Sequence, residues 1–236
     1  MRNSRRTRKK IKRISIILGL VLGILLMILL SLLIDDKEIA SKKETMKKEM
    51  ALDNDLTITS VEPYSGKYVE DGSDDEVKDV LMITIRNDGT QSLQYAELNV
   101  EYGEEIAEFS LSTLKPGESV LVLEKNKMKY REKSEITSTQ LKNVVYFQQP
   151  LTLCEDIILI SAKDGAFNVE NVSGQDLKGQ VAIYYKNKLD ASYLGGITYR
   201  AVIEEGIEKD GIKQIMTSHY IVDKSEVIFV TYIEKE

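Results

Sequence analysis

Side chains that could support nucleophilic catalysis are scarce in this sequence. It contains one histidine, His219, and one cysteine, Cys154. A cysteine nucleophile needs a base within hydrogen-bond reach and surroundings that favour the thiolate, and Cys154 has no basic neighbour in the sequence. One histidine and one cysteine are also too few for a usual zinc site. We therefore predict a protein that is not an enzyme, with no catalytic residue, no cofactor and no metal site.

Acidic side chains are concentrated in residues 70–76, which read EDGSDDE. Calcium prefers oxygen ligands of this kind, but the spacing lacks the order of an EF-hand loop. We expect a solvated loop, with a calcium site as the alternative. No pair of acids elsewhere is distinguished from ordinary surface charge, so an unrecognised envelope hydrolase is the less favoured hypothesis.

Tyrosines could stack on a sugar ligand, and four of them lie close together in the sequence. They are Tyr184, Tyr185, Tyr193 and Tyr199. Alternation along a strand places Tyr185 and Tyr199 on the side of the neighbouring isoleucines, which predicts a core position for both. Tyr184 and Tyr193 are the candidates for exposed, ligand-binding positions, and a packing role for these tyrosines is the favoured alternative.

An uncharged apolar run, residues 14–34, dominates the start of the chain. At a helical rise of about 1.5 Å per residue it is roughly 31 Å long, which matches the hydrocarbon core of a bilayer. Residues 1–13 carry eight basic side chains and no acid, so they are expected to remain in the cytoplasm. A cleaved signal peptide is the competing interpretation, but the run lacks a small-residue cleavage site. The sequence thus predicts a single-pass membrane protein with residues 35–236 outside the cytoplasm.

The charge of the exported part limits its partners. Residues 35–236 contain 24 basic and 38 acidic residues, a net charge of −14. Such a surface repels nucleic acid at long range, so we expect no nucleic-acid partner. The predicted partners are membrane lipid, through residues 14–34, and an unidentified envelope protein or polymer.

Self-association is a further hypothesis. Gly19 and Gly23 form a Gly-x-x-x-Gly pattern, which permits close packing of membrane helices. An accessory subunit of a membrane complex, paired through this helix, is therefore an alternative function. Residues 35–55 are dense in Lys and Glu and are predicted to form a charged stalk with helical character. A weak coiled coil in the stalk would make a homodimer, although its apolar positions are few.

After the stalk, alternating apolar residues and frequent turns predict antiparallel strands. The clearest strand, residues 81–86, stops at the turn signal Asn87-Asp88-Gly89. The pattern Ile83-x-Ile85-x-Asn87, with Leu93 six residues later, returns as Phe167-x-Val169-x-Asn171 with Leu177 six residues later. We therefore predict an all-β fold of two tandem antiparallel β-sandwiches, residues 56–149 and 150–236, after the N-terminal transmembrane helix.

One stretch resembles a known family. The strand, the Asn-Asp-Gly turn, the following strand and the run Leu114-Lys115-Pro116-Gly117-Glu118-Ser119 are similar to the immunoglobulin-like and fibronectin-type sandwiches of bacterial membrane-anchored surface proteins. The resemblance covers about 45 residues of the first predicted domain and, more loosely, the second. It implies the fold and carries over no functional residue. The expected function is a non-enzymatic binding or assembly module at the cell envelope.

Overall fold

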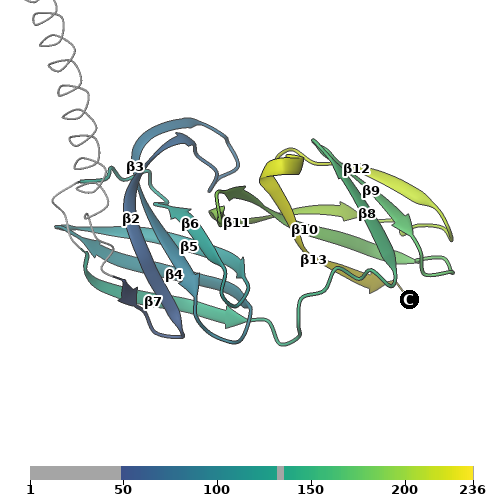
Figure 1. Ribbon diagram of the computed structural model, residues 1–236, viewed down its shortest axis with the longest axis horizontal. Coiled ribbons are helices and arrows are strands. Elements are labelled where there is room, and N and C mark those ends of the chain that lie inside the picture. Colours follow the sequence, from purple (N-terminus) through teal and green to yellow (C-terminus); the bar gives the residue numbers. More distant parts are fainter. Residues whose placement is uncertain (1–48, 132–135, 236) are drawn as a thin grey trace, which may run out of the picture. The chain divides into compact units, whose positions relative to one another are not determined.

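The computed structural model describes residues 49–131 and 136–235, and these form a β-rich protein (Figure 1). The strands are β1 (Met50–Ala51), β2 (Leu56–Lys67), β3 (Glu76–Asn87), β4 (Leu93–Tyr102), β5 (Glu105–Leu114), β6 (Ser119–Leu123), β7 (Ile136–Tyr146), β8 (Ile158–Lys163), β9 (Ala166–Asn171), β10 (Gly179–Leu189), β11 (Ser192–Ile203), β12 (Ile212–Met216) and β13 (Ser225–Glu234), with one 3-10 turn, η1 (Val222–Lys224). The predicted β character is confirmed for these residues. We call β1–β7 the first strand group and β8–β13 the second strand group.

Both strand groups have the same strand order. In the first, β2-β3-β6 and β5-β4-β7 are hydrogen-bonded in these orders; in the second, β8-β9-β12 and β11-β10-β13 are. If β2–β7 and β8–β13 are each numbered one to six, both groups read 1-2-5 and 4-3-6. The alternating apolar residues of each group face inward, as a half-buried strand requires.

One sheet continues from the first strand group into the second. It has seven strands in the order β1-β2-β3-β6-β11-β10-β13. The connection is a short parallel pairing of β6 with β11, in which Tyr193 faces Val120 and Leu194 faces Leu121. The strands on either side of residue 150 therefore share backbone hydrogen bonds, which the sequence did not indicate.

Each strand group has its own apolar core. The first core is built mainly from β2 to β6, but it also includes Tyr193, Ile228 and Phe229 of the second strand group. The second core is built mainly from β8 to β11 and β13. Burial of these side chains is the main driving force for folding. Since the first core takes side chains from both groups, the two groups are joined by packing as well as by the shared sheet.

Two buried asparagines, Asn87 and Asn171, hold the repeated pattern in equivalent ways. The Asn87 side-chain amide donates to the carbonyls of Gln91 and Leu114, both at 2.9 Å. The Asn171 amide donates to the carbonyls of Gln175, at 2.7 Å, and Ile207, at 3.0 Å. Each side-chain oxygen accepts from the backbone N–H two residues further on. The repeat in the sequence is thus a repeated hydrogen-bond arrangement.

The structure differs from the sequence-based prediction in two segments. The acidic connection after the first strand is shorter than expected, because β2 continues to Lys67 and β3 already begins at Glu76. At the end of the predicted stalk, Met50–Ala51 is a short strand paired with Thr57 and Ile58, whereas helical character was expected. Backbone pairing with β2 replaces the local helical hydrogen bonds there.

The predictions for the N-terminal segment lie outside the described residues. They are the basic tail, residues 1–13, the transmembrane helix, residues 14–34, the packing residues Gly19 and Gly23, and the stalk up to residue 48. Within residues 49–131 and 136–235, no helix is long and apolar enough to cross a membrane.

Candidate functional site: a polar pocket beside the linker

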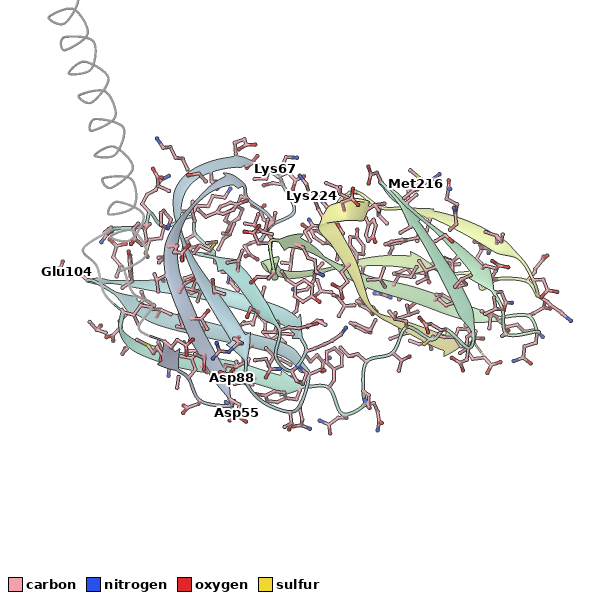
Figure 2. All side chains as sticks on the ribbon, in the orientation of Figure 1. Asp55, Lys67, Asp88, Glu104, Met216 and Lys224 are labelled. Atoms are coloured by element: carbon pink, nitrogen blue, oxygen red, sulfur yellow. The ribbon has the colours of Figure 1, made fainter. Side chains whose placement is uncertain are left out.

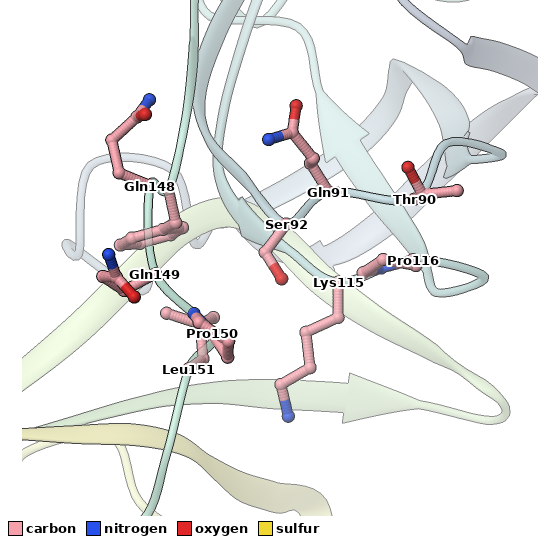
Figure 3. A pocket seen from close by; sticks show the side chains of 10 residues that line it. Thr90, Gln91, Ser92, Lys115, Pro116, Gln148, Gln149, Pro150 and Leu151 are labelled. Atoms are coloured by element: carbon pink, nitrogen blue, oxygen red, sulfur yellow. The ribbon is translucent and has the colours of Figure 1, made fainter.

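A pocket of 370 Å³ lies where two turns of the first strand group meet the segment that leads to β8 (Figure 3). Its walls are Thr90–Ser92 from the β3–β4 turn, Lys115–Pro116 from the β5–β6 turn, and Phe147–Leu151 from the connecting segment. We call it the linker pocket. Its volume is in the range of small-molecule sites, which is about 300 to 1,000 Å³.

Backbone hydrogen bonds fix the three walls relative to one another. Asn87 holds both turns, because its side chain binds the carbonyl of Gln91 and its own carbonyl accepts from the Gly117 N–H at 2.7 Å. The Phe147 N–H donates to the Ser92 carbonyl at 2.9 Å, which attaches the connecting segment to the first turn. The pocket is therefore formed before any ligand arrives.

The lining of the linker pocket combines apolar side chains with hydrogen-bonding groups and contains no acid. It offers the side-chain amides of Gln91, Gln148 and Gln149 and the hydroxyls of Thr90 and Ser92. Lys115 is its only charged residue, and its ammonium forms no salt bridge with any acid of the described chain. Figure 3 shows the amides of Gln91 and Gln148 at one end of the pocket and this ammonium at the other.

The acids nearest to the pocket in sequence are engaged elsewhere. Asp88, labelled in Figure 2, accepts a hydrogen bond from Nε of Arg86 at 2.5 Å, and this contact lowers the pKa of the Asp88 carboxyl. The Glu118 carboxylate accepts from the Lys115 backbone N–H and from the Tyr193 hydroxyl, each at 3.0 Å. The linker pocket therefore keeps a positive charge on a chain whose surface is acidic.

A row of aromatic rings continues from the pocket wall. The Phe147 ring meets the Phe229 ring edge-on, with centroids 5.4 Å apart. Tyr184 stacks on Phe229 at 4.1 Å, and the Arg200 guanidinium lies over Tyr184. Tyr184, a candidate ligand residue, is thus half-buried and two rings away from the pocket, where it supports the wall through Phe229.

The hypothesis that Tyr193 is exposed is wrong. Its side chain is 4 % exposed and belongs to the first core. Burial and the neighbouring Glu118 raise the pKa of the Tyr193 hydroxyl. Alternation along the strand did not reveal this, because β11 leaves one core and enters the other. Tyr185 is buried as predicted, whereas Tyr199 is half-buried and stacks on the Tyr185 ring.

Two opposite charges, half-buried Glu70 and buried Lys186, lie where β6 meets β11. The Glu70 carboxylate accepts from the backbone N–H of Leu123, at 2.8 Å, and of Gly196, at 2.9 Å. Burial raises the pKa of this carboxyl, and the two N–H groups and Lys186 oppose the rise. Glu70 therefore joins the two strands at the point where their parallel pairing ends.

The other charge, Lys186, is 0 % exposed. Its ammonium donates to the carbonyls of Gly196, at 3.1 Å, and Ile197, at 2.8 Å. Burial lowers the pKa of Lys186 to about 7, and the charges of Glu70 and Glu118 oppose this change. Both charged groups bind backbone groups of the fold, so we assign them a structural role.

The remaining candidate residues are not brought together. Cys154 donates to the Val230 carbonyl at 3.5 Å, whereas His219 Nδ1 lies 3.6 Å from the Asp74 carboxylate and its ring stacks on Tyr199. In the acidic loop, Lys127 contacts Asp71 and Asp75. Among the residues that the structure describes, no group of three or more metal-ligating side chains is placed to hold an ion.

Sequence reasoning missed the linker pocket, although one of its walls was visible in the sequence. The run around Pro116 carries a Pro-Gly turn signal, but residues 147–151, which read FQQPL, had no periodic signal to link them to it. Comparisons with family models, curated proteins and solved structures find no match to this chain.

Proposed function

We propose that this chain is a single-pass membrane protein whose extracytoplasmic β modules form a non-enzymatic binding module at the cell envelope. The ligand site in this proposal is the linker pocket. The observation that carries it is a preformed pocket of 370 Å³, rich in hydrogen-bonding groups, with neither a nucleophile and base pair nor a metal-ligating cluster in its lining. Such a lining binds and orients a ligand but offers no group to attack it.

The membrane location is supported by the sequence. The uncharged run of residues 14–34 matches the thickness of a bilayer, and the basic residues 1–13 favour an internal N-terminus. The net charge of −14 on residues 35–236 suits a solvated, exported region.

The common strand order supports the proposal that each strand group is an immunoglobulin-like sandwich, with the boundary near residue 150. The orders 1-2-5 and 4-3-6 occur in both groups. Sandwiches of this kind present loops at their ends, and the linker pocket is built from such loops. Loops on a rigid scaffold are common positions for binding residues.

Site-specific photocrosslinking in intact cells tests this proposal. The full chain carries a photoreactive amino acid in place of Gln148, in the pocket, or in place of exposed Lys163 on β8 as the matched control. We expect the chain to remain in membranes after an alkaline wash and to form a discrete adduct from position 148 only. A chain released by the wash, or equal adducts from both positions, would contradict the proposal.

A further inference from the structure

We propose that the linker pocket binds an acidic saccharide unit, that is, a sugar ring that carries a carboxylate. This inference rests on the proposed function and names the ligand class of the same site. It follows from the groups that line the pocket, from the charge of Lys115 and from a comparison with the equivalent turns of the second strand group.

The neutral groups of the pocket match the hydroxyls of a sugar. A side-chain amide both donates and accepts hydrogen bonds, and so does a hydroxyl. Five lining residues carry such groups, namely Gln91, Gln148, Gln149, Thr90 and Ser92. Of these, the Gln148 amide also donates to the Tyr146 carbonyl at 3.5 Å. A ring with several hydroxyl groups can satisfy these groups, whereas a purely apolar ligand would leave them without partners.

The walls between these polar groups are apolar and suit the carbon–hydrogen faces of a ring. Pro116 stands on one side, and Pro150 and Leu151 stand on the other. Phe147 is held in place by its contact with Phe229. A few fixed polar groups among apolar walls are typical of small-molecule sites.

Lys115 adds the preference for a carboxylate. Its ammonium has no acidic partner in the described part of the chain, and no acid lines the pocket. A charge-assisted hydrogen bond to a carboxylate is about twice as strong as a neutral one. The nearby Glu118 forms no salt bridge with this ammonium, and its oxygens accept from the Lys115 backbone N–H and the Tyr193 hydroxyl.

The equivalent turns of the second strand group carry the opposite charge. Counted from the paired asparagines, Ser92 corresponds to Asp176. Asn87 binds the carbonyl of Leu114, and Asn171 binds the carbonyl of Ile207. The residues that follow these two carbonyls are Lys115 and Glu208, so these residues correspond. The turns of the second group also hold Lys209, but Asp176, Glu208 and Asp210 leave them with a net negative charge, which disfavours an anionic ligand. The two strand groups thus share the asparagine-bound turns, but Lys115 of the first group is replaced by an acid in the second.

The test is to measure the binding of D-glucuronate to the full chain by calorimetry or ligand-observed NMR. Two control ligands are measured in the same way: D-glucose, which has the ring but no carboxylate, and acetate, which has the carboxylate but no ring. We expect D-glucuronate to bind with a Kd in the millimolar range, and D-glucose and acetate to bind at least about tenfold more weakly. Lys115→Met should lower the affinity for D-glucuronate about tenfold, whereas Lys163→Met should leave it unchanged.

Three outcomes would overturn the inference. They are no saturable binding of D-glucuronate up to about 50 mM, equal binding of acetate, or unchanged binding by a folded Lys115→Met variant. Thermal unfolding of each variant verifies that it is folded. If the inference fails but position 148 still crosslinks to an envelope component in cells, the binding function stands and only the ligand class is wrong.

Discussion

The two strand groups share a frame and differ in the chemistry that is placed on it. Asn87 and Asn171 are buried at equivalent positions and bind the carbonyls of equivalent turns. The turns themselves carry Lys115 in the first group and Glu208 in the second. Residues that fix the backbone therefore recur, whereas the charged residues at the turns do not, and our proposal places ligand binding at the turns of the first group only.

The groups also bury charges of opposite sign. Glu124 of the first group is fully buried, and its carboxylate accepts from the backbone N–H groups of Glu108, Asn126 and Met128. Lys186 of the second group is fully buried among backbone carbonyls. Both charges are stabilised by backbone dipoles, so removal of either one would leave several polar groups without partners.

The largest expected effect is at Gly196, where the second strand group meets the first. A Cβ atom at this position would lie 1.9 Å from the Ser110 carbonyl oxygen, so Gly196→Ala forces β11 away from β5. We expect a loss of about 4 kcal/mol or more in the free energy of unfolding, measured by denaturant titration.

Gly174→Ala is the control for this change. A Cβ atom at Gly174 has no atom within 4 Å, and only the positive φ of 76° adds strain, so the loss should be about 1 kcal/mol. Equal losses in the two variants would show that β11 is not tightly packed against β5.

The second effect is the pH dependence caused by Lys186. Its pKa is about 7 in the folded chain, against an ordinary value of 10.5. Between these values the unfolded chain binds a proton that the folded chain does not, so the free energy of unfolding rises with pH, by at most about 1.4 kcal/mol per pH unit. Lys186→Met should lose this rise between about pH 7.5 and 9.5.

Lys163→Met is the matched control and should keep the rise. Glu70 titrates in the opposite sense: its raised pKa adds stability below its ordinary value of 4.5, and this is lost as the pH rises through the folded value. Because Lys186 opposes the rise in the Glu70 pKa, Lys186→Met also raises that pKa further, so the difference between variant and parent reports both groups. Parallel curves for the parent and Lys186→Met would contradict a buried, destabilised ammonium.

The third effect compares the two asparagines directly. Asn87→Ala and Asn171→Ala should each lower the free energy of unfolding by about 2 to 3 kcal/mol, because each leaves buried carbonyls without a donor. The double variant should lose about the sum of the two, since the sites share no partner. A neutral result at one site, measured by chemical unfolding, would break the equivalence of the two groups.

The smallest effect on stability is expected from Lys115→Glu, which gives the first group the charge of the second. Lys115 is partly exposed and forms no ion pair in the described chain, so the free energy of unfolding should change by less than about 0.5 kcal/mol. Binding of D-glucuronate should nevertheless be lost. A variant that binds as well as the parent would show that Lys115 does not select the ligand.

The sequence predicted local features of the fold well and long-range features poorly. The strand near residues 81–86, the turn after Asn87 and the repeat at Asn171 depend on alternation and turn chemistry, which are local. The structural role of Glu70 depends on the N–H groups of Leu123 and Gly196, which lie far along the chain, so the acidic run did not reveal it.

The inward orientation of Lys186 has a similar cause. Simple alternation places it opposite to buried Tyr185, on the outer side of β10. Register shifts next to Tyr185, in the pairings with β11 and with β13, break this alternation and let both side chains be buried. The linker pocket was missed for the same reason, since three separate segments form it.

The most direct test of the account is a residue-by-residue NMR map of the full chain with and without D-glucuronate. The account predicts shift changes confined to residues 90–92, 115–116 and 147–151, with none at the equivalent turns, residues 174–176 and 207–209. Shift changes at the second strand group, or none in the linker pocket at saturating ligand, would contradict the claim that only the first group carries the binding site.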